Sequence, residues 1–226
     1  MGSGKNNVGA YFTAESGSWD AKYAPGGTMS GRLGAFHAQV AAVSGAGERL
    51  CDLGCGTGAL LEAVGDLGLR VVGGDLSDGM LRAAARRGAC AGTLAQLDGG
   101  TGLPFRDRAF QVVLSSSVLE YVPDARRYAA EVRRVLTPGG YWILTVPDMG
   151  HWIRSVESVE RAVYAVAPWA GRRWAPMRSQ YQAMSVNRWG LAAWTTMFGE
   201  NGFVVRRVSR ELRGLLLLTL RKDTNE

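Results

Sequence analysis

The feature that most constrains the fold is an alternation of apolar runs with helix-like segments after residue 48. The strand-like runs are residues 49–53, 70–76, 91–97, 110–117 and 141–146. The segments between them that read as helices are residues 59–67, 78–87 and 124–136. The fourth run, FQVVLSSS, is nearly continuously apolar, as expected of a strand buried on both faces. The alternation predicts a doubly wound α/β fold with a mostly parallel sheet and right-handed crossovers.

The two ends of the chain depart from this alternation. After a helix predicted near residues 187–200, two apolar runs at 202–209 and 213–221 are joined by a short link. Such runs favour an antiparallel pair, so we predict a seven-stranded sheet with an antiparallel last strand. Residues 1–28 are rich in Gly, Ser and aromatics and predict an arm with at most short helices, followed by a helix over residues 30–46.

The predicted organisation has three parts. Residues 1–46 form an N-terminal arm and helix that lids the candidate site, and residues 47–147 with 187–226 form the core. Residues 148–186 match neither the strand nor the helix alternation, and we interpret them as an inserted, aromatic-rich helical cap.

A glycine-rich loop follows the first predicted strand and opens the next helix. Its sequence, DLGCGTGAL, places glycines at Gly54, Gly56 and Gly58. Open parallel sheets bind ligands beyond the carboxyl ends of their strands, and the loop occupies that place. The dinucleotide fingerprint is G-x-G-x-x-G, whereas these glycines read G-x-G-x-G, which favours a ligand without a pyrophosphate. A tight turn that binds nothing is the alternative.

Three segments in the same order resemble the motifs of class I S-adenosylmethionine-dependent methyltransferases of the small-molecule type. They are DLGCGTG (52–58), VVGGDLSDGML (71–81) and QLDGGTGLPFRDRAFQVVLSSSVLEYVPD (96–124). The resemblance spans about residues 49–220. It implies a Rossmann-like fold, S-adenosylmethionine as the methyl donor and S-adenosylhomocysteine as the product.

The resemblance also implies which residues bind the cofactor. The glycine loop would pass under its amino-acid moiety, and Asp98 would pair with its adenine. Asp75 lies 23 residues after Asp52, near the offset at which an acid binds ribose hydroxyls in related folds. One extra residue between Asp98 and Leu103 leaves the backbone register of this segment open. The implied residues are Asp52, Gly54, Cys55, Gly56, Gly58, Asp75, Leu76, Met80, Leu97, Asp98, Gly99, Ser115 and Ser116.

The N-terminal arm carries a further resemblance to small-molecule methyltransferases. The segment SWDAKY, followed by Arg32, is similar to a preamble in which an aromatic residue lids the cofactor and an arginine meets its carboxylate. This adds Trp19, Tyr23 and Arg32 to the implied cofactor site. The alternative is that Trp19 packs in the core and Arg32 is solvated.

Methyl transfer needs orientation, removal of water and, for some acceptors, a base. His151 lies just beyond the fifth predicted strand, and an imidazole can take up a proton near neutral pH. It is therefore the candidate base, with Tyr11, Glu15, Glu120 and Tyr181 as weaker candidates. Aromatic walls suit a planar or apolar molecule, and the cap residues that could supply them are Trp152, Tyr164, Trp169 and Trp174.

The charge balance bears on the partner. The chain has a net charge of +6, but its arginines occur in scattered pairs rather than in a basic block. Enzymes that methylate nucleic-acid bases usually carry an Asn/Asp-Pro-Pro-aromatic segment after the fourth strand, where this chain reads SSSVLEY. We therefore expect a small-molecule acceptor. An RNA methyltransferase and a cofactor-binding protein or cyclase without methyl transfer remain alternatives.

Composition completes the prediction. The 3 cysteines are too few and too irregular for a disulfide framework or a zinc site. The first residues lack the apolar core of a signal peptide, and LLLLTL is far shorter than the ~20 residues that span a bilayer. We expect a cytoplasmic enzyme with no metal and no membrane partner, and leave a homodimer open. Its predicted reaction methylates an O or N atom, less favourably C, of a small aromatic or apolar metabolite, in secondary metabolism such as antibiotic biosynthesis.

Overall fold

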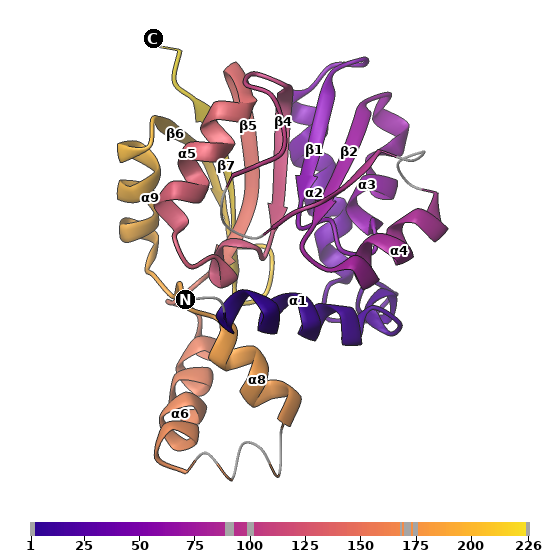
Figure 1. Cartoon of the computed structure of the whole chain (residues 1–226). Helices are drawn as coiled ribbons and strands as arrows, with labels where there is room; N and C mark the ends of the chain where they lie inside the picture. The colour runs from indigo at the N-terminus through magenta and orange to yellow at the C-terminus, as the bar shows by residue number, and fades with distance from the viewer. Residues whose placement is uncertain are drawn as a thin grey trace.

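The computed structural model describes residues 3–88, 93–98, 102–167, 169, 173 and 176–224. In this part of the chain the strands form one seven-stranded sheet in the order β3-β2-β1-β4-β5-β7-β6 (Figure 1). No helix among these residues is both long enough and apolar enough to cross a membrane. The strands are β1 (Arg49–Leu53), β2 (Arg70–Asp75), β3 (Leu94–Gln96), β4 (Phe110–Ser116), β5 (Leu136–Pro147), β6 (Phe203–Ser209) and β7 (Leu215–Lys222).

The strand pairing confirms the predicted fold class. Strand β1 pairs in parallel with both β2 and β4. The chain therefore builds the sheet outward from β1 in one direction through β2 and β3, and in the opposite direction through β4 and β5. Strand β7 runs antiparallel to both of its neighbours, β5 and β6. A ligand site is therefore expected at the carboxyl ends of β1, β2 and β4, which is the switch point of the sheet.

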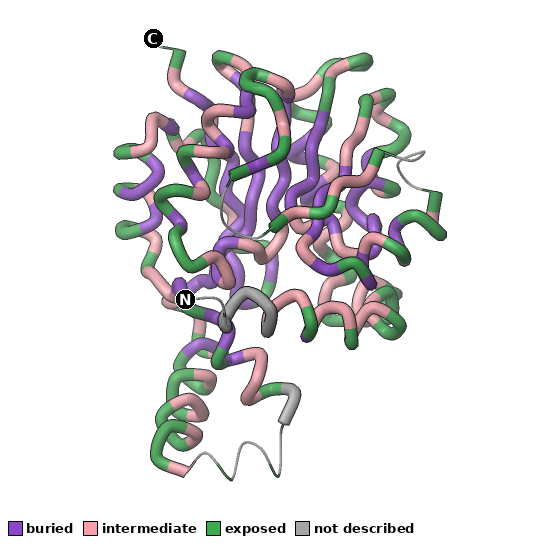
Figure 2. The backbone as a smooth tube through the Cα atoms, in the orientation of Figure 1, coloured by how far each residue is buried: buried purple, intermediate pink, exposed green. Residues whose placement is uncertain are grey.

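Helices cover both faces of the sheet, and its central strands are mostly buried (Figure 2). The buried hydrophobic side chains form two clusters. On one face, Val132 of α5 and Trp194 of α9 pack with Trp142 of β5. On the other, Phe36 of α2 and Leu61 of α3 pack against β1 and β4. The covering helices are α2 (Ser30–Val43), α3 (Ala59–Ala63), α4 (Asp78–Arg87), α5 (Ala125–Val135) and α9 (Leu191–Glu200), with short 3-10 helices η1 (Trp19–Lys22), η2 (Gly65–Leu67) and η3 (Leu119–Tyr121).

The N-terminal arm differs from the prediction of at most short helices. Residues Ser3–Glu15 form one 13-residue helix, α1, which lies across the end of the sheet where the candidate loop is (Figure 1). Contacts with α4 hold it there, because the Thr13 hydroxyl bonds with the hydroxyl of Ser77 at 2.8 Å and donates to Asp78 at 3.2 Å. Tertiary packing thus gives a helix to a segment whose composition does not favour one.

Strand β5 also differs, since it begins at Leu136 and not at Tyr141 as predicted. The sequence TPGG reads as a helix stop, but Leu136 already pairs with Phe110 of β4. Phe110 pairs with Leu136 and Val112 pairs with Tyr141, so the register of the two strands shifts between these pairs. The additional residues of β5 are accommodated at this irregularity of the sheet.

The described residues of the segment predicted as a cap include the helices α6 (Trp152–Val166) and α8 (Pro176–Met184), which extend away from the sheet beyond α1 (Figure 1). Arg154, only 6% exposed, connects α6 to the link between β6 and β7. Its guanidinium donates to the Gly214 carbonyl at 2.7 and 3.0 Å and to Glu157 at 2.8 Å. The cap is therefore attached to the core through a buried charge.

Candidate functional site

The glycine loop closes tightly over the end of β1. Gly54, Gly56 and Gly58 have φ values of 82°, 54° and 81°, a region that side-chain-bearing residues rarely adopt. A Cβ on Gly54 would lie 2.4 Å from the Val118 side chain. The N–H groups of Gly54 and Cys55 both donate to the Gly74 carbonyl, at 2.7 and 3.0 Å. The loop is thus fixed to the end of β2, with no room for side chains at its first glycine.

Asp75, at the end of β2, is connected to the same loop. One carboxylate oxygen accepts from the Gly56 N–H and the other from the Ser77 N–H, each at 2.8 Å. Burial raises the pKa of Asp75, while these two N–H groups act to lower it. Since each carboxylate oxygen can accept more than one hydrogen bond, Asp75 keeps acceptor capacity for a ligand.

Asp52 has a different environment. Its side chain is completely buried, and among the described residues no group donates a hydrogen bond to either of its carboxylate oxygens. Burial and the nearby negative charge of Asp75 raise the pKa of Asp52 to about 7. A buried carboxylate without a hydrogen-bond donor is unfavourable, and a cation bound nearby would relieve the cost.

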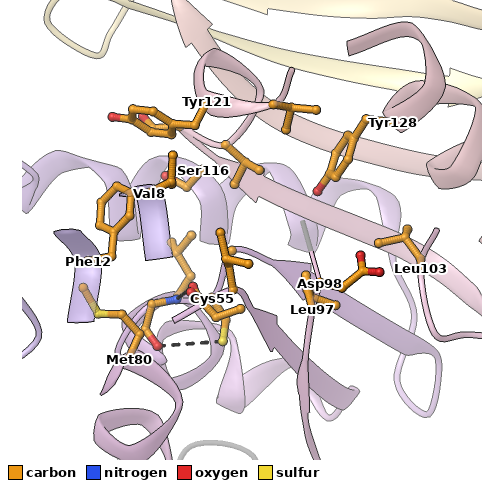
Figure 3. Close-up of a pocket in the computed structure, with 18 of the residues that line it drawn as sticks. Val8, Phe12, Cys55, Met80, Leu97, Asp98, Leu103, Ser116, Tyr121 and Tyr128 are labelled. Atoms are coloured by element: carbon orange, nitrogen blue, oxygen red, sulfur yellow. Dashed lines mark hydrogen bonds between the residues drawn. The ribbon is translucent and has the colours of Figure 1, made fainter. Parts of the chain in front are cut away.

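These residues adjoin a cavity of about 300 Å³ at the carboxyl ends of β1, β2 and β4. Figure 3 shows Asp98 beside Leu97 and Leu103 on one side of this cavity, and Phe12 with Met80 on the other. The sequence-predicted residues that line it are Trp19, Tyr23, Arg32, Gly54, Cys55, Gly56, Asp75, Leu76, Met80, Leu97, Asp98, Ser116 and Tyr181. The cavity therefore brings together residues from all three motifs, from the arm and from the cap.

Arg32 reaches the cavity from α2. Its guanidinium donates to the hydroxyls of Ser116 and Ser117, at 3.2 and 3.0 Å. Ser117 has a φ of 57°, and its N–H donates to the Thr145 hydroxyl at 2.8 Å. A left-handed backbone on a residue other than glycine is uncommon and costs energy, and such residues concentrate at functional sites.

A row of aromatic rings forms one wall of the cavity. Phe12 contacts Trp19 and Tyr121 edge to face, with ring centroids 5.4 Å apart in both pairs. Tyr121 in turn lies 5.8 Å from Tyr181 of the cap. Phe12 and Tyr121 are not among the residues predicted for the site from the sequence. The segment LEYVPD directly after the fourth strand was a usable signal for Tyr121, whereas Phe12 depended on the unexpected helix α1.

Further lining residues were also missed by sequence reasoning. They come from α1, from the segment after β4 and from α5, and they include Asp124, Arg127, Tyr128 and Glu131. The side of α5 that faces the cavity depends on how this helix packs on the sheet, so the sequence alone could not identify these residues. The cavity therefore extends past Asp98 toward α5.

The buried acid Glu120 accepts hydrogen bonds from hydroxyl groups of the cap. Tyr181 and Ser185 donate from their hydroxyls to one oxygen of Glu120, at 3.5 and 3.3 Å. Burial raises the pKa of Glu120, although the charges of Arg154 and Arg32 act to lower it. Burial and Glu120 raise the pKa of Tyr181 to about 12, so its hydroxyl stays protonated and polar near neutral pH.

Several predicted residues lie outside the described lining of the cavity. His151 is the N-terminal cap of α6, where its Nδ1 accepts from the Ile153 N–H at 3.2 Å. Glu15 pairs with Lys22 at 3.2 Å, and Ser115 accepts from the Trp142 indole at 3.1 Å. Gly99 and Trp174 lie outside the described residues. The remaining residues beyond the lining are Tyr11, Asp52, Gly58, Trp152, Tyr164 and Trp169.

Of the predicted substrate residues of the cap, the described ones, Trp152, Tyr164 and Trp169, do not line the cavity. Trp152 and Trp169 are 61% and 58% exposed. Tyr181 is the described cap residue that reaches the lining. Within the described residues, no group of three His, Cys, Asp or Glu side chains is placed to hold a metal ion.

Known proteins resemble the chain in sequence and in fold. A family profile described as a methyltransferase domain matches residues 51–144. The demethylmenaquinone methyltransferase of Renibacterium salmoninarum is 33% identical over 178 residues, which cover 75% of this chain and 73% of that relative. The malonyl-[acyl-carrier protein] O-methyltransferase of Serratia marcescens is 35% identical over 139 residues, about half (51%) of its length.

A solved structure agrees with the sequence matches. The crystal structure of an S-adenosylmethionine-dependent methyltransferase from Thermotoga maritima superposes with a TM-score of 0.66 at 16% sequence identity. The match covers 95% of this chain and 99% of that chain. A sequence identity of 16% supports similarity of fold alone, and this similarity extends over nearly the whole length of both chains.

Proposed function

Because the chain belongs to the class I S-adenosylmethionine-dependent methyltransferases, we propose that it transfers a methyl group from S-adenosylmethionine to a small, planar and largely apolar acceptor. The methylated atom is proposed to be O or N, with a ring carbon as the less favoured choice. The observation that carries the proposal is the cavity itself, which joins the glycine loop, Asp75 and Asp98 to an aromatic wall.

The residues present fit the proposed cofactor. The left-handed backbone at Gly54, Gly56 and Gly58 keeps the loop free of side chains, as expected where a ligand approaches the main chain closely. Asp75 and Asp98 line the cavity with carboxylates suited to hydroxyl and amino groups. The buried charge of Asp52 favours a cationic ligand nearby. When bound, S-adenosylmethionine supplies an activated methyl carbon on a sulfonium.

The work of the chain is then to hold and orient the two reactants and to exclude water. Arg32, which bonds to the Ser116 and Ser117 hydroxyls, is proposed to meet the cofactor's carboxylate. Phe12, Trp19, Tyr121 and Tyr181 are proposed to cover the reacting groups. His151 stays the predicted base, but its position as the cap of α6 favours a reaction that depends on orientation more than on this imidazole.

The aromatic wall also guides the choice of acceptor. The names of the relatives give two acceptors, demethylmenaquinone and a malonyl group on a carrier protein. Aromatic side chains pack well against planar rings. The wall of Phe12, Tyr121 and Tyr181 thus favours an acceptor with a ring over a carrier-bound acyl chain. The cytoplasm is proposed as the compartment, since the 3 cysteines are too few and too irregular for a disulfide framework. Secondary metabolism stays a prediction.

The proposal is tested with purified protein, methyl-labelled S-adenosylmethionine and a panel of phenols, amines and quinols. We expect cofactor binding by calorimetry, followed by label in an organic product and release of S-adenosylhomocysteine. Binding without transfer to any acceptor would favour the cofactor-binding protein or cyclase. Absence of cofactor binding would contradict the proposal as a whole. Label in added RNA, with affinity falling steeply as salt rises, would favour the RNA methyltransferase.

A further inference from the structure

Helix α6 of the cap presents its apolar side chains to solvent. Trp152, Val156, Val159, Val163 and Val166 are 61, 45, 65, 47 and 85% exposed. They are spaced by four and three residues in turn, which places them on one side of the helix over all its 15 residues. The other exposed residues of α6 are uncharged as well: Ser155, Ser158, Ala162 and Ala165. We call this set of nine side chains the α6 face.

The charged side chains of α6 all point the other way and are paired with the rest of the protein. This is the reverse of a surface helix of a globular protein, which buries its apolar stripe and exposes its charges. The pairs are Arg154 with Glu157 and the Gly214 carbonyl, Glu157 with Arg188, Glu160 with Arg178 and Gln182, and Arg161 with the Gln182 carbonyl.

An exposed apolar stripe of this extent indicates a surface that another molecule covers. We propose that the α6 face is a dimer interface, in which α6 packs antiparallel against α6 of a second copy of this chain. The proposal concerns assembly and is independent of the proposed function. Figure 1 shows α6 on the outer part of the cap, away from the sheet, so two copies can approach through it.

The composition of the face suits another helix. Alternating spacings of four and three residues are those of helices that pack side by side. Small residues, Ser158, Ala162 and Ala165 among them, allow two backbones to approach closely. Because the face has no charge, two copies meet on it without like-charge repulsion.

Charges at the two ends of the helix favour the antiparallel direction. The N-terminus of one α6 would lie beside the C-terminus of the other, where the helix dipoles attract. Arg213 is exposed next to the N-terminal end, with its guanidinium carbon 5.5 Å from the centroid of the Trp152 ring. In the antiparallel pair it lies near the final carbonyl groups of the partner's helix, an arrangement that stabilises the C-terminal end.

The size of the face sets the expected strength. A 15-residue helix is about 22 Å long and about 10 Å wide, so each copy contributes a footprint of about 220 Å² and the pair about 440 Å², below the roughly 1,000 Å² of specific interfaces. The dimer is therefore expected to be weak and dependent on concentration. Val159 lies at the midpoint between Trp152 and Val166, so an antiparallel pair brings Val159 next to its own copy.

The first test measures self-association of the full chain by sedimentation velocity at about 1–200 µM. We expect dimer formation within this range and a dissociation constant at least about tenfold larger for Val159→Glu. Val204→Glu is the matched control, because Val204 is also an exposed valine (41%) but lies on β6, opposite Arg221. A melting temperature close to that of the parent chain shows that each variant is folded.

A second test locates the contact. In a chain with Cys90→Ser, Val159→Cys is expected to form a disulfide-linked dimer on mild oxidation, and Val204→Cys is not. The remaining thiols, Cys51 and Cys55, are buried. A parent chain that stays monomeric, or a dimer unaffected by Val159→Glu, would overturn the proposal. A monomer that floats with vesicles of anionic lipid, and loses this binding in Val159→Glu, would assign the face to a membrane surface instead.

Discussion

Two acids on neighbouring strands, Asp75 in the cavity lining and Asp52 buried outside it, have different electrostatic environments. Asp75 accepts hydrogen bonds from two backbone N–H groups, whereas Asp52 accepts none from the described residues. The charge of Asp52 also acts to raise the pKa of Tyr23 and of Tyr128, which both line the cavity, and of the buried Cys51. Asp52 thus places a negative charge in a buried position, which is energetically unfavourable, and a cationic ligand bound nearby would offset this desolvation cost.

The first prediction concerns pH. Asp52 has a pKa of about 7 in the folded chain and an ordinary value of 3.8, so the folded chain binds this proton more tightly. Its contribution makes the free chain less stable as pH rises from about 4 to about 7. A bound cation favours the carboxylate, and we therefore expect the affinity for S-adenosylmethionine to rise from about pH 5.5 to 8. Calorimetry across this range measures it.

Asp52→Asn serves as the comparison for this pH profile. The amide does not titrate, so the variant should bind S-adenosylmethionine more weakly above neutral pH. Its affinity should also change less with pH than that of the parent chain. A profile identical in the parent chain and the variant would remove Asp52 as the source of the effect and would direct attention to Asp75.

The second prediction concerns Asp75. Asp75→Ala removes a charged acceptor from the cavity and from the Gly56 N–H, so cofactor affinity should fall by about 1.5–3 kcal/mol. Asp75→Asn keeps one oxygen acceptor and should lose less. Titration calorimetry gives both values, with the melting temperature of each variant as a check on the fold. Equal affinity in the parent chain and both variants would contradict a ribose-binding role.

At the scale of elements, the boundaries that the sequence predicted correctly are those defined locally. Strand β1 ends where the apolar run meets the glycine loop, and α4 lies between the Ser77 cap and Gly88, whose φ is 72°. Helix α1 and the early start of β5 depended on contacts with α4 and β4, which no local pattern contains. Phe12 was missed because its position depends on the tertiary contacts of α1, whereas Asp75 and Asp98 belong to local sequence motifs and were predicted to be in the site.

The third prediction tests how the cap is attached. Replacing Arg154 by Met leaves Glu157 buried with one partner fewer and the Gly214 carbonyl without its donor. Removal of one partner of a buried ion pair costs about 3–5 kcal/mol, so the free energy of unfolding should fall by roughly 3 kcal/mol. Urea denaturation measures this change.

Arg178→Met is the matched control for this prediction. Arg178 also pairs with an acid of α6, Glu160, but its side chain is 52% exposed. Exposed pairs contribute about 0–1 kcal/mol, so the control should remain close to the parent chain. Equal losses in the two variants would show that the buried connection to Gly214 has no special role.

At the scale of the whole molecule, binding in the cavity links α1, the sheet and the cap, since all three contribute lining residues. The fourth prediction follows from this linkage. At about 100 times its dissociation constant, a ligand of the folded state adds about 2.7 kcal/mol, which raises the melting temperature of a chain of this size by roughly 5–10 °C. Scanning fluorimetry with S-adenosylmethionine measures the shift, and methionine alone, at equal concentration, should give little.

The position of Tyr181 carries a consequence for the evolution of this chain. In the proposed function, cofactor recognition rests on motifs from the first half of the sequence, whereas this ring enters the cavity from the segment between β5 and α9. That segment can accumulate substitutions, or be exchanged with that of a paralogue, without altering how the methyl donor is held. A family built in this way can diversify its acceptors by changing one crossover connection while the donor half is inherited intact.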